Sequence, residues 1–244
     1  MAQLQNGYAR SGSVVREGAE VDAGLRAYML RVYNYMSAGV ALTGVVAFFT
    51  AQAATSNPAV AQLLYQSPLK WVIMFAPLAF VMFLSFRVYK MSPGTAQIAF
   101  WAFAAVMGVS LSAIFLVFTG ASIAQVFFVT AAAFASLSVY GYTTKKDLTG
   151  WGSFLIMGVV GIILAALLNL FLQSSGLSFA INVIGVLIFA GLTAYDTQQI
   201  KDGYYAVRDD AALMTKSAIM GALSLYLDFI NMFTMLLQLV GNRE

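Results

Sequence analysis

The 244-residue sequence contains no cysteine and no histidine. Their absence excludes disulfides, thiol nucleophiles, zinc sites built from Cys and His, and a histidine general base. Charge is scarce too, because Asp, Glu, Lys and Arg make up 9% of the chain, against about 25% in an ordinary soluble domain. With 61% hydrophobic residues, the chain is expected to fold in a lipid bilayer rather than in water.

Two further absences restrict the function. Residues 1–27 are polar and mixed in charge, with no apolar segment after a basic start, so we expect no cleavable signal peptide. No basic cluster is interleaved with exposed aromatic residues, so the net charge of +3 does not indicate nucleic-acid binding. The sequence indicates no cofactor.

Seven long apolar stretches dominate the chain, each close to the roughly 20 residues that a helix needs to cross a bilayer. They cover residues 33–54, 69–86, 96–118, 121–140, 151–172, 179–200 and 217–240. Trp71, Trp101 and Trp151 lie near the ends of these stretches, as interfacial tryptophans do. We expect an all-α integral membrane protein with one seven-helix domain over residues 26–244, preceded by a polar cytoplasmic tail over residues 1–25. Two groups of three helices and a separate last helix are its natural division.

The distribution of lysine and arginine predicts the orientation, since short cytoplasmic loops carry an excess of both. A cytoplasmic N-terminus places eleven of them inside and leaves only Lys70 and Arg243 outside. The eleven are Arg10, Arg16, Arg26, Arg31, Arg87, Lys90, Lys145, Lys146, Lys201, Arg208 and Lys216. Seven spans then place the C-terminus outside, unless the last helix re-enters the membrane.

Two of the ten acidic residues lie inside apolar stretches. Asp196 occurs near the end of the sixth, in "GLTAYDTQQIKD", and Asp228 near the middle of the seventh, in "LSLYLDFINMF". The other acids lie in the N-terminal tail, in inner loops or at the C-terminus, where water solvates them. An ionised side chain at the bilayer centre costs about 2.5–3.5 kcal/mol on insertion scales, so such residues usually face the bundle interior and mark a pathway.

The last apolar stretch carries a polar or small stripe on one helical face. Its members are Ser217, Gly221, Ser224, Asp228, Asn231, Met235 and Gln238. A weaker stripe on the sixth stretch includes Asn182, Gly185, Thr193 and Asp196. Both stripes are expected to face protein or water, and Ser224, Asn231 and Thr193 are candidates to line a pathway. Plain helix packing through small and polar residues is the alternative.

If the two aspartates meet, they form a proton-sensitive pair. Two carboxylates in a poorly solvated site cannot both ionise cheaply, so they would share a proton and lose it as the pH rises. Counting residues from the helix ends places them at depths that differ by roughly 6–9 Å, which tilt or a longer sixth helix would reduce. A permanently protonated pair that only joins the helices is the alternative.

Arg87 ends the second apolar stretch in "FLSFRVYKMSP", on the same side as Asp196. It could pair with an aspartate and block a pathway. Alternatively, Arg87 and Lys90 extend to the membrane surface and only fix the topology.

Two other classes of seven-helix protein fit poorly. A retinal protein needs a lysine inside the last helix, whereas Lys216 lies at its mouth. Paired intramembrane aspartates also serve in presenilin-type proteases, but there the second aspartate follows Gly-x-Gly, while this sequence reads "LYLD". We therefore expect a protein that is not an enzyme.

Four segments resemble the transmembrane Bax inhibitor motif family, also called Bax inhibitor-1-like, and most of all its bacterial inner-membrane branch. They are "FRVYKMSPGTAQIAFWAFAAVMGVSLS" (86–112), "GYTTKKDLTGWGSFL" (141–155), "GLTAYDTQQIKD" (191–202) and "ALSLYLDFINMFTMLLQLVG" (222–241). The resemblance extends over nearly the whole chain from about Leu25.

The resemblance implies two three-helix layers around a central last helix. It also implies a pH-sensitive calcium leak, with Asp196 and Asp228 as a hydrogen-bonded sensor and Arg87 as an alternating partner. The connection from Lys201 to Lys216 is expected to be long for a bacterial member. Nothing in the sequence resembles a calcium-ligand loop, so calcium comes from the resemblance alone.

We thus expect a pH-gated cation leak in a bacterial inner membrane, with calcium as the permeant ion. The alternative is a regulatory membrane protein that binds a membrane-bound protease or stress and cell-death machinery through its N-terminal tail. The oligomeric state and the physiological partner are not indicated.

Overall fold

The computed structural model describes residues 2–243, with side chains described from Asp22 to Arg243. Seven of its helices are long and apolar enough to cross a membrane, as the sequence predicts. They are α1 (Ala2–Ser56), α3 (Leu69–Arg87), α4 (Pro93–Leu111), α6 (Gly120–Thr143), α7 (Thr149–Leu172), α8 (Ser175–Val207) and α9 (Ala211–Val240). Short helices α2 (Pro58–Ala61), η1 (Gln62–Gln66), η2 (Val88–Lys90) and α5 (Ile114–Val117) lie between them.

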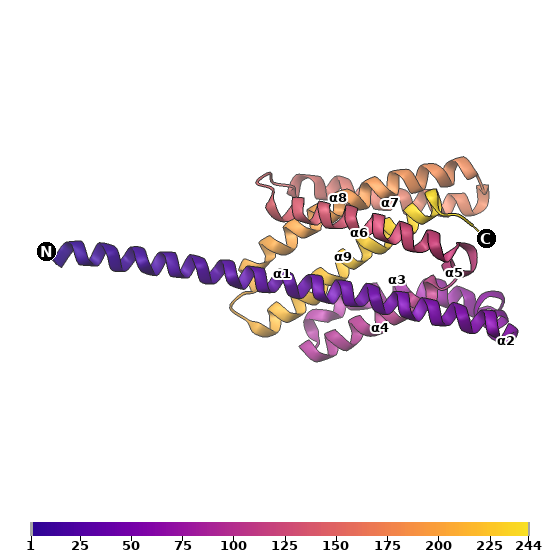
Figure 1. Ribbon diagram of the computed structural model, residues 1–244, viewed down its shortest axis with the longest axis horizontal. Coiled ribbons are helices and arrows are strands. Elements are labelled where there is room, and N and C mark those ends of the chain that lie inside the picture. The colour runs from indigo at the N-terminus through magenta and orange to yellow at the C-terminus, as the bar shows by residue number, and fades with distance from the viewer. Residues whose placement is uncertain (1, 244) are drawn as a thin grey trace.

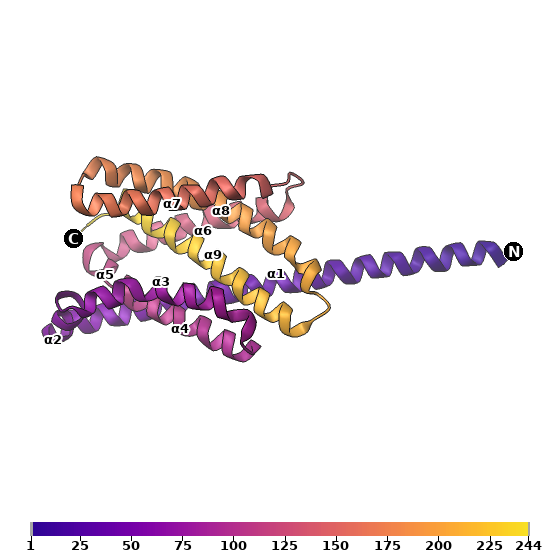
Figure 2. The same ribbon diagram turned by 180° about the vertical axis from the view of Figure 1, so that it is seen from behind.

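The long helices form two groups with α9 between them (Figure 1). In one group α4 packs against α1 and α3, and in the other α8 packs against α6 and α7. α9 runs diagonally between the groups in both views (Figure 2) and contacts α1, α4, α6 and α8. This arrangement confirms the expected layers around a central last helix.

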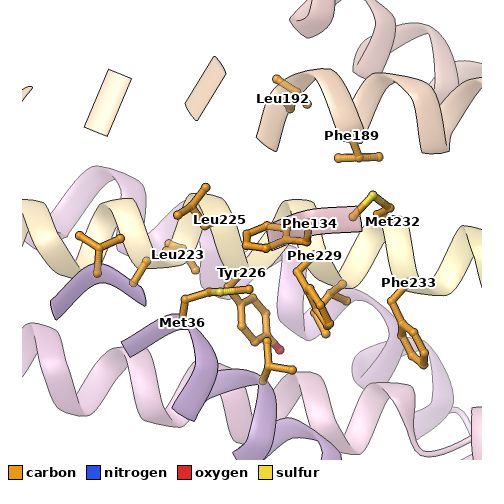
Figure 3. Packing of buried hydrophobic residues seen from close by; sticks show 14 of the residues in the cluster. Met36, Phe134, Phe189, Leu192, Leu223, Leu225, Tyr226, Phe229, Met232 and Phe233 are labelled. Carbon is orange, nitrogen blue, oxygen red and sulfur yellow. The ribbon is translucent and has the colours of Figure 1, made fainter. Parts of the chain in front are cut away.

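α9 is central because it can be buried on every side. Its apolar positions Ile219, Leu223 and Leu237 are at most 2% exposed, although they lie opposite the polar stripe. Aromatic side chains fill the space between α9 and its neighbours (Figure 3). The Tyr226 ring lies 5.3 Å from that of Phe103 on α4, and the Phe229 ring 5.6 Å from that of Phe134 on α6.

One buried hydrogen-bond chain joins three helices around Tyr226. The Tyr226 hydroxyl lies 2.6 Å from the Thr43 hydroxyl of α1, and Thr43 donates to the Ala104 carbonyl of α4 at 2.8 Å. The polar end of the tyrosine is therefore satisfied inside an apolar core. In contrast, α3 and α7 expose most of their apolar side chains, such as Phe171 at 86%, as helices facing lipid do.

The expected long connection between the last two helices is wrong. α8 continues to Val207 and α9 begins at Ala211, which leaves only residues 208–210 between them. Tyr204, 6% exposed, packs against Tyr28 of α1 with ring centroids 5.5 Å apart and so extends α8 beyond its apolar stretch. Asp210 caps α9 by accepting hydrogen bonds from the amides of Ala212 and Leu213.

The two chain ends lie at opposite ends of the bundle (Figure 1). The C-terminal residues are fixed to the start of α6, where Thr119 donates to the Asn242 carbonyl and Asn242 donates to the Ser122 hydroxyl. The connections that follow α3, α6 and α8 lie at the other end, with α1 entering there (Figures 1 and 2). Lys90, Lys145, Lys146 and Arg208 lie in these connections. Arg243 lies at the opposite end, beside the start of α6.

Gly141 provides a test of the α6–α8 packing. A Cβ at this position would overlap the backbone of Ala194, so Gly141→Ala must separate the two helices. We expect a loss of stability on the order of 1–3 kcal/mol, measured as thermal or denaturant unfolding in detergent. Gly161→Ala on α7, where a Cβ meets nothing within 4 Å, is the control and should be neutral or slightly stabilising. Equal stability of both variants would contradict the close contact.

Candidate functional site: two aspartates at the α8–α9 interface

A cavity of about 220 Å³ lies between α8, α9, η2 and α1, at the end with the basic connections. Its polar lining comes from Tyr28, Tyr89, Asp196, Gln199, Ser217 and Ser224. Lys216 bounds this region by donating to the Tyr89 carbonyl at 3.0 Å. Asp196 and Ser224 therefore line one polar cavity.

Asp228 lies deeper and has a different environment. The residue is 4% exposed, and its Oδ2 has no hydrogen-bond partner among the described residues. A buried polar atom of this kind is uncommon and costly. Asp228 is therefore a candidate functional group rather than a satisfied packing residue.

Three contacts set the register between α8 and α9. The Asn182 amide donates to the Gln238 side chain at 3.2 Å, Gly185 lies against Met235, and Gly221 lies against Ile200. α8 and α9 are antiparallel, so residues that lie at the same height have residue numbers with a constant sum. In each of the three pairs this sum is 420 or 421.

The residue numbers of Asp196 and Asp228 add to 424, which is three or four more than for residues at the same height. Asp228 is therefore three or four residues farther along α9 than the position that lies beside Asp196. At 1.5 Å per residue, Asp228 lies about 5 Å farther from the basic end than Asp196. The offset is smaller than expected from counting to the helix ends, because side-chain contacts rather than helix ends set the register. The two carboxyl groups form no hydrogen bond with each other in the described part of the chain.

The other predicted site residues lie outside this cavity. Thr193 is fully buried and donates to the Phe189 carbonyl of its own helix, and Asn231 donates to the Leu227 carbonyl. Arg87 is exposed at the end of α3, and within residues 22–243 it forms no ion pair with either aspartate. The role of Arg87 as an alternating partner stays a prediction.

The residues around Asp196 hold the connection between α6 and α7. Gln198 accepts from the Leu148 amide at 2.8 Å and donates to the Lys146 carbonyl at 2.9 Å, while Lys201 donates to the Tyr142 carbonyl at 3.0 Å. In the same connection, hydrogen bonds from the Thr149 side chain and backbone lower the pKa of the exposed Asp147 carboxyl. The sequence analysis did not predict these contacts, although Gln198 and Gln199 beside a membrane aspartate are a signal for them.

A second polar cluster lies at the opposite end of the α8–α9 interface. Asn169, Ser178, Asn182 and Gln238 line a cavity of about 170 Å³. Met235 lies between this cluster and the aspartates, where it packs directly on Gly185. The structure thus has polar cavities at both ends of the interface, with Asp228 and the Met235–Gly185 contact between them.

Comparison with known proteins places the chain in a family. The pattern of the family described as "Inhibitor of apoptosis-promoting Bax1" matches residues 25–244. The chain belongs to the Bax inhibitor-1-like family. An uncharacterized protein of Caulobacter vibrioides is 47% identical over the full length of both chains. The protein named Inner membrane protein YbhL of Escherichia coli K12 is 45% identical over 97% of this chain and 99% of its own.

These relatives and the seven apolar helices make the protein a multi-pass integral membrane protein. An uncharacterized protein of Rickettsia prowazekii is also 45% identical, over 97% of this chain and 98% of its own. Membership of the family and its fold therefore extend over nearly the whole chain.

The absence of cysteine allows a direct test of the inner cavity. Single-cysteine variants at Ser224, which lines the cavity, and at Thr193, which is fully buried, differ in their expected access to water. We expect a water-soluble thiol reagent to label Ser224→Cys at least tenfold faster than Thr193→Cys, measured by gel shift in intact vesicles. Equal labelling rates would contradict a water-accessible cavity that reaches Ser224 but not Thr193.

Proposed function

We propose that the protein is a pH-sensitive cation leak of a bacterial inner membrane, with calcium as the permeant ion and the N-terminus in the cytoplasm. The observation that supports this proposal best is the unpartnered Asp228 carboxyl, one helical turn beyond the cavity that Asp196 lines. The orientation rests on the basic connections that gather at one end of the bundle. The bacterial inner membrane is the location that the name of YbhL gives for that relative.

The aspartates keep a proton because an ionised carboxylate has a high free energy inside the membrane. An unpaired carboxylate in a nearly dry site is disfavoured relative to the neutral acid. The ionisable groups that face Asp196 across the cavity are Tyr28 and Tyr89, and neither supplies a cation. Lys216 at the edge of the cavity donates to the Tyr89 carbonyl and, within the described residues, forms no ion pair with Asp196. Within the described residues, Asp228 likewise has no cationic partner.

Raising the pH removes this proton, and the resulting charge on Asp228 requires water or a cation. Because Asp228 lies on the central helix, meeting that requirement separates α9 from α8. Separation also lifts Met235 from Gly185 and joins the two polar cavities. The leak should therefore increase as the pH rises, which is the sign expected when the protonated form is the closed one.

Weak binding is expected for a passing ion. No group of three or more acidic residues in the part of the chain from Asp22 to Arg243 could hold a metal ion. Calcium prefers six to eight oxygen ligands, and the interface offers two carboxylates, hydroxyls and side-chain amides. The proposed function is transport rather than enzymatic catalysis.

A second role is favoured by one observation. α1 continues as a helix from the bundle to Ala2, and its first part extends away from every other helix (Figure 1). An extended helix on the cytoplasmic side suits a regulatory protein that binds a membrane-bound protease. In this alternative, deletion of residues 2–21 abolishes binding of that partner while calcium flux stays unchanged.

Calcium flux into proteoliposomes between pH 5 and 8 tests the leak. We expect a wild-type flux that rises with pH, because deprotonation opens the interface. Asp196→Asn and Asp228→Asn remove the titrating groups and should make the flux independent of pH.

Asp202→Asn is the matched control, since Asp202 is an exposed acid farther along α8. Its pH dependence should equal that of the wild type. A wild-type pH dependence that survives both interface variants would overturn the proposed gate.

A further inference from the structure

A separate apolar groove lies between α1 and α6. Both helices pack on α9 but make little contact with each other, and the space between them is a cavity of about 620 Å³. Phe229 of α9 forms part of its lining, and neither Asp196 nor Asp228 does. A second cavity of about 240 Å³ shares Val40, Phe127 and Phe229 with it. The two cavities together form one groove toward the opposite end of the bundle.

The length of the larger cavity matches one leaflet of a bilayer. Its α1 lining runs from Arg26 to Ala41, fifteen residues apart, which is about 22 Å along a helix. Half of a bilayer with its headgroups is about 20–22 Å thick. The larger cavity is therefore long enough to extend from the headgroup region to about the bilayer centre.

The polar side chains of the groove concentrate at its basic end. Arg26, Tyr33 and Tyr142 line that end, and the remaining walls are mainly apolar. The Lys201 amine lies 5.7 Å from the centre of the Tyr142 ring. No carboxylate between Asp22 and Arg243 forms an ion pair with Arg26. The groove thus combines a positive, hydroxyl-bearing end with an apolar remainder.

We propose that this groove binds an anionic phospholipid of the cytoplasmic leaflet, with its phosphate at Arg26 and the tyrosine hydroxyls and one acyl chain against Phe134 and Phe229. The arrangement of charge and apolar surface is that of a phospholipid, with a headgroup at one end. The choice of the cytoplasmic leaflet rests on the orientation proposed above, whereas lipid binding itself does not depend on ion flux.

The bound chain would also support the central helix. Phe229 follows Asp228 in the sequence and packs against Phe127 and Phe134 of α6, with ring centroids 5.5 and 5.6 Å apart. An acyl chain in the groove covers these rings on the side that α1 leaves open. It therefore packs against the part of α9 that lies between α1 and α6.

Native mass spectrometry of the full-length protein with phosphatidylglycerol and phosphatidylcholine tests this site. We expect the wild type to retain one phosphatidylglycerol with about fivefold preference, the amount that one basic residue near a membrane surface supplies. Arg26→Gln should remove the preference. Arg31→Gln, which changes an exposed arginine of α1 that does not line the groove, should keep it.

Variants that fill the groove test the acyl-chain position. Ala135→Trp on α6 and Ala41→Trp on α1 both place a large ring in the groove, so each should lose the retained lipid. Ala132→Trp, at an exposed position of α6 outside the groove lining, should retain it. Three outcomes would overturn the proposal. The first is unchanged lipid retention in both groove variants, and the second is equal retention of the two lipids by the wild type. The third is a crosslink between two copies of the chain through position 135.

Discussion

A carboxyl group in the hydrocarbon layer is costly unless protein or water surrounds it, and Asp228 imposes this constraint on α9. A helix at the edge of the bundle would expose the acid to lipid. α9 instead lies between the two groups of helices, and its buried residues occupy every side. The two-layer architecture is thus the arrangement that keeps this one side chain away from lipid while leaving it one turn from a polar cavity.

The same interface combines close packing with polarity. Gly221 lies against Ile200 and Gly185 against Met235, so small residues bring α8 and α9 together on either side of the aspartates. Polar residues lie beyond both contacts, toward the two membrane surfaces. An interface of this kind is closed by a few apolar contacts, and small movements of α9 would change the access of water to its centre.

Much of this arrangement could be predicted from the sequence. The seven helices follow from the length of the apolar stretches, and the side of α9 that faces α8 follows from a stripe with helical spacing. The register of the two helices could not be predicted, because it depends on which side chain packs against which glycine. The end of α8 could not be predicted either. The polar residues around Tyr204 predict a loop, whereas a contact with Tyr28 keeps them helical. Local patterns also do not show the hydrogen bonds of Gln198 to the α6–α7 connection or the groove beside Arg26. Both depend on residues that are distant in the sequence.

The proposed gate requires that Asp228 holds a proton at neutral pH and that Asp196 affects its release. Infrared difference spectroscopy of the protein in bilayers between pH 6 and 9 measures this directly through the carbonyl band of a protonated carboxyl group. Acids in water are ionised over this whole range, so they contribute no such band. We expect a band that disappears as the pH rises, is absent in Asp228→Asn, and disappears at a different pH in Asp196→Asn. The proposed gate is contradicted if, at pH 6, the wild-type spectrum has no protonated carboxyl band, or if that band is unchanged in Asp228→Asn.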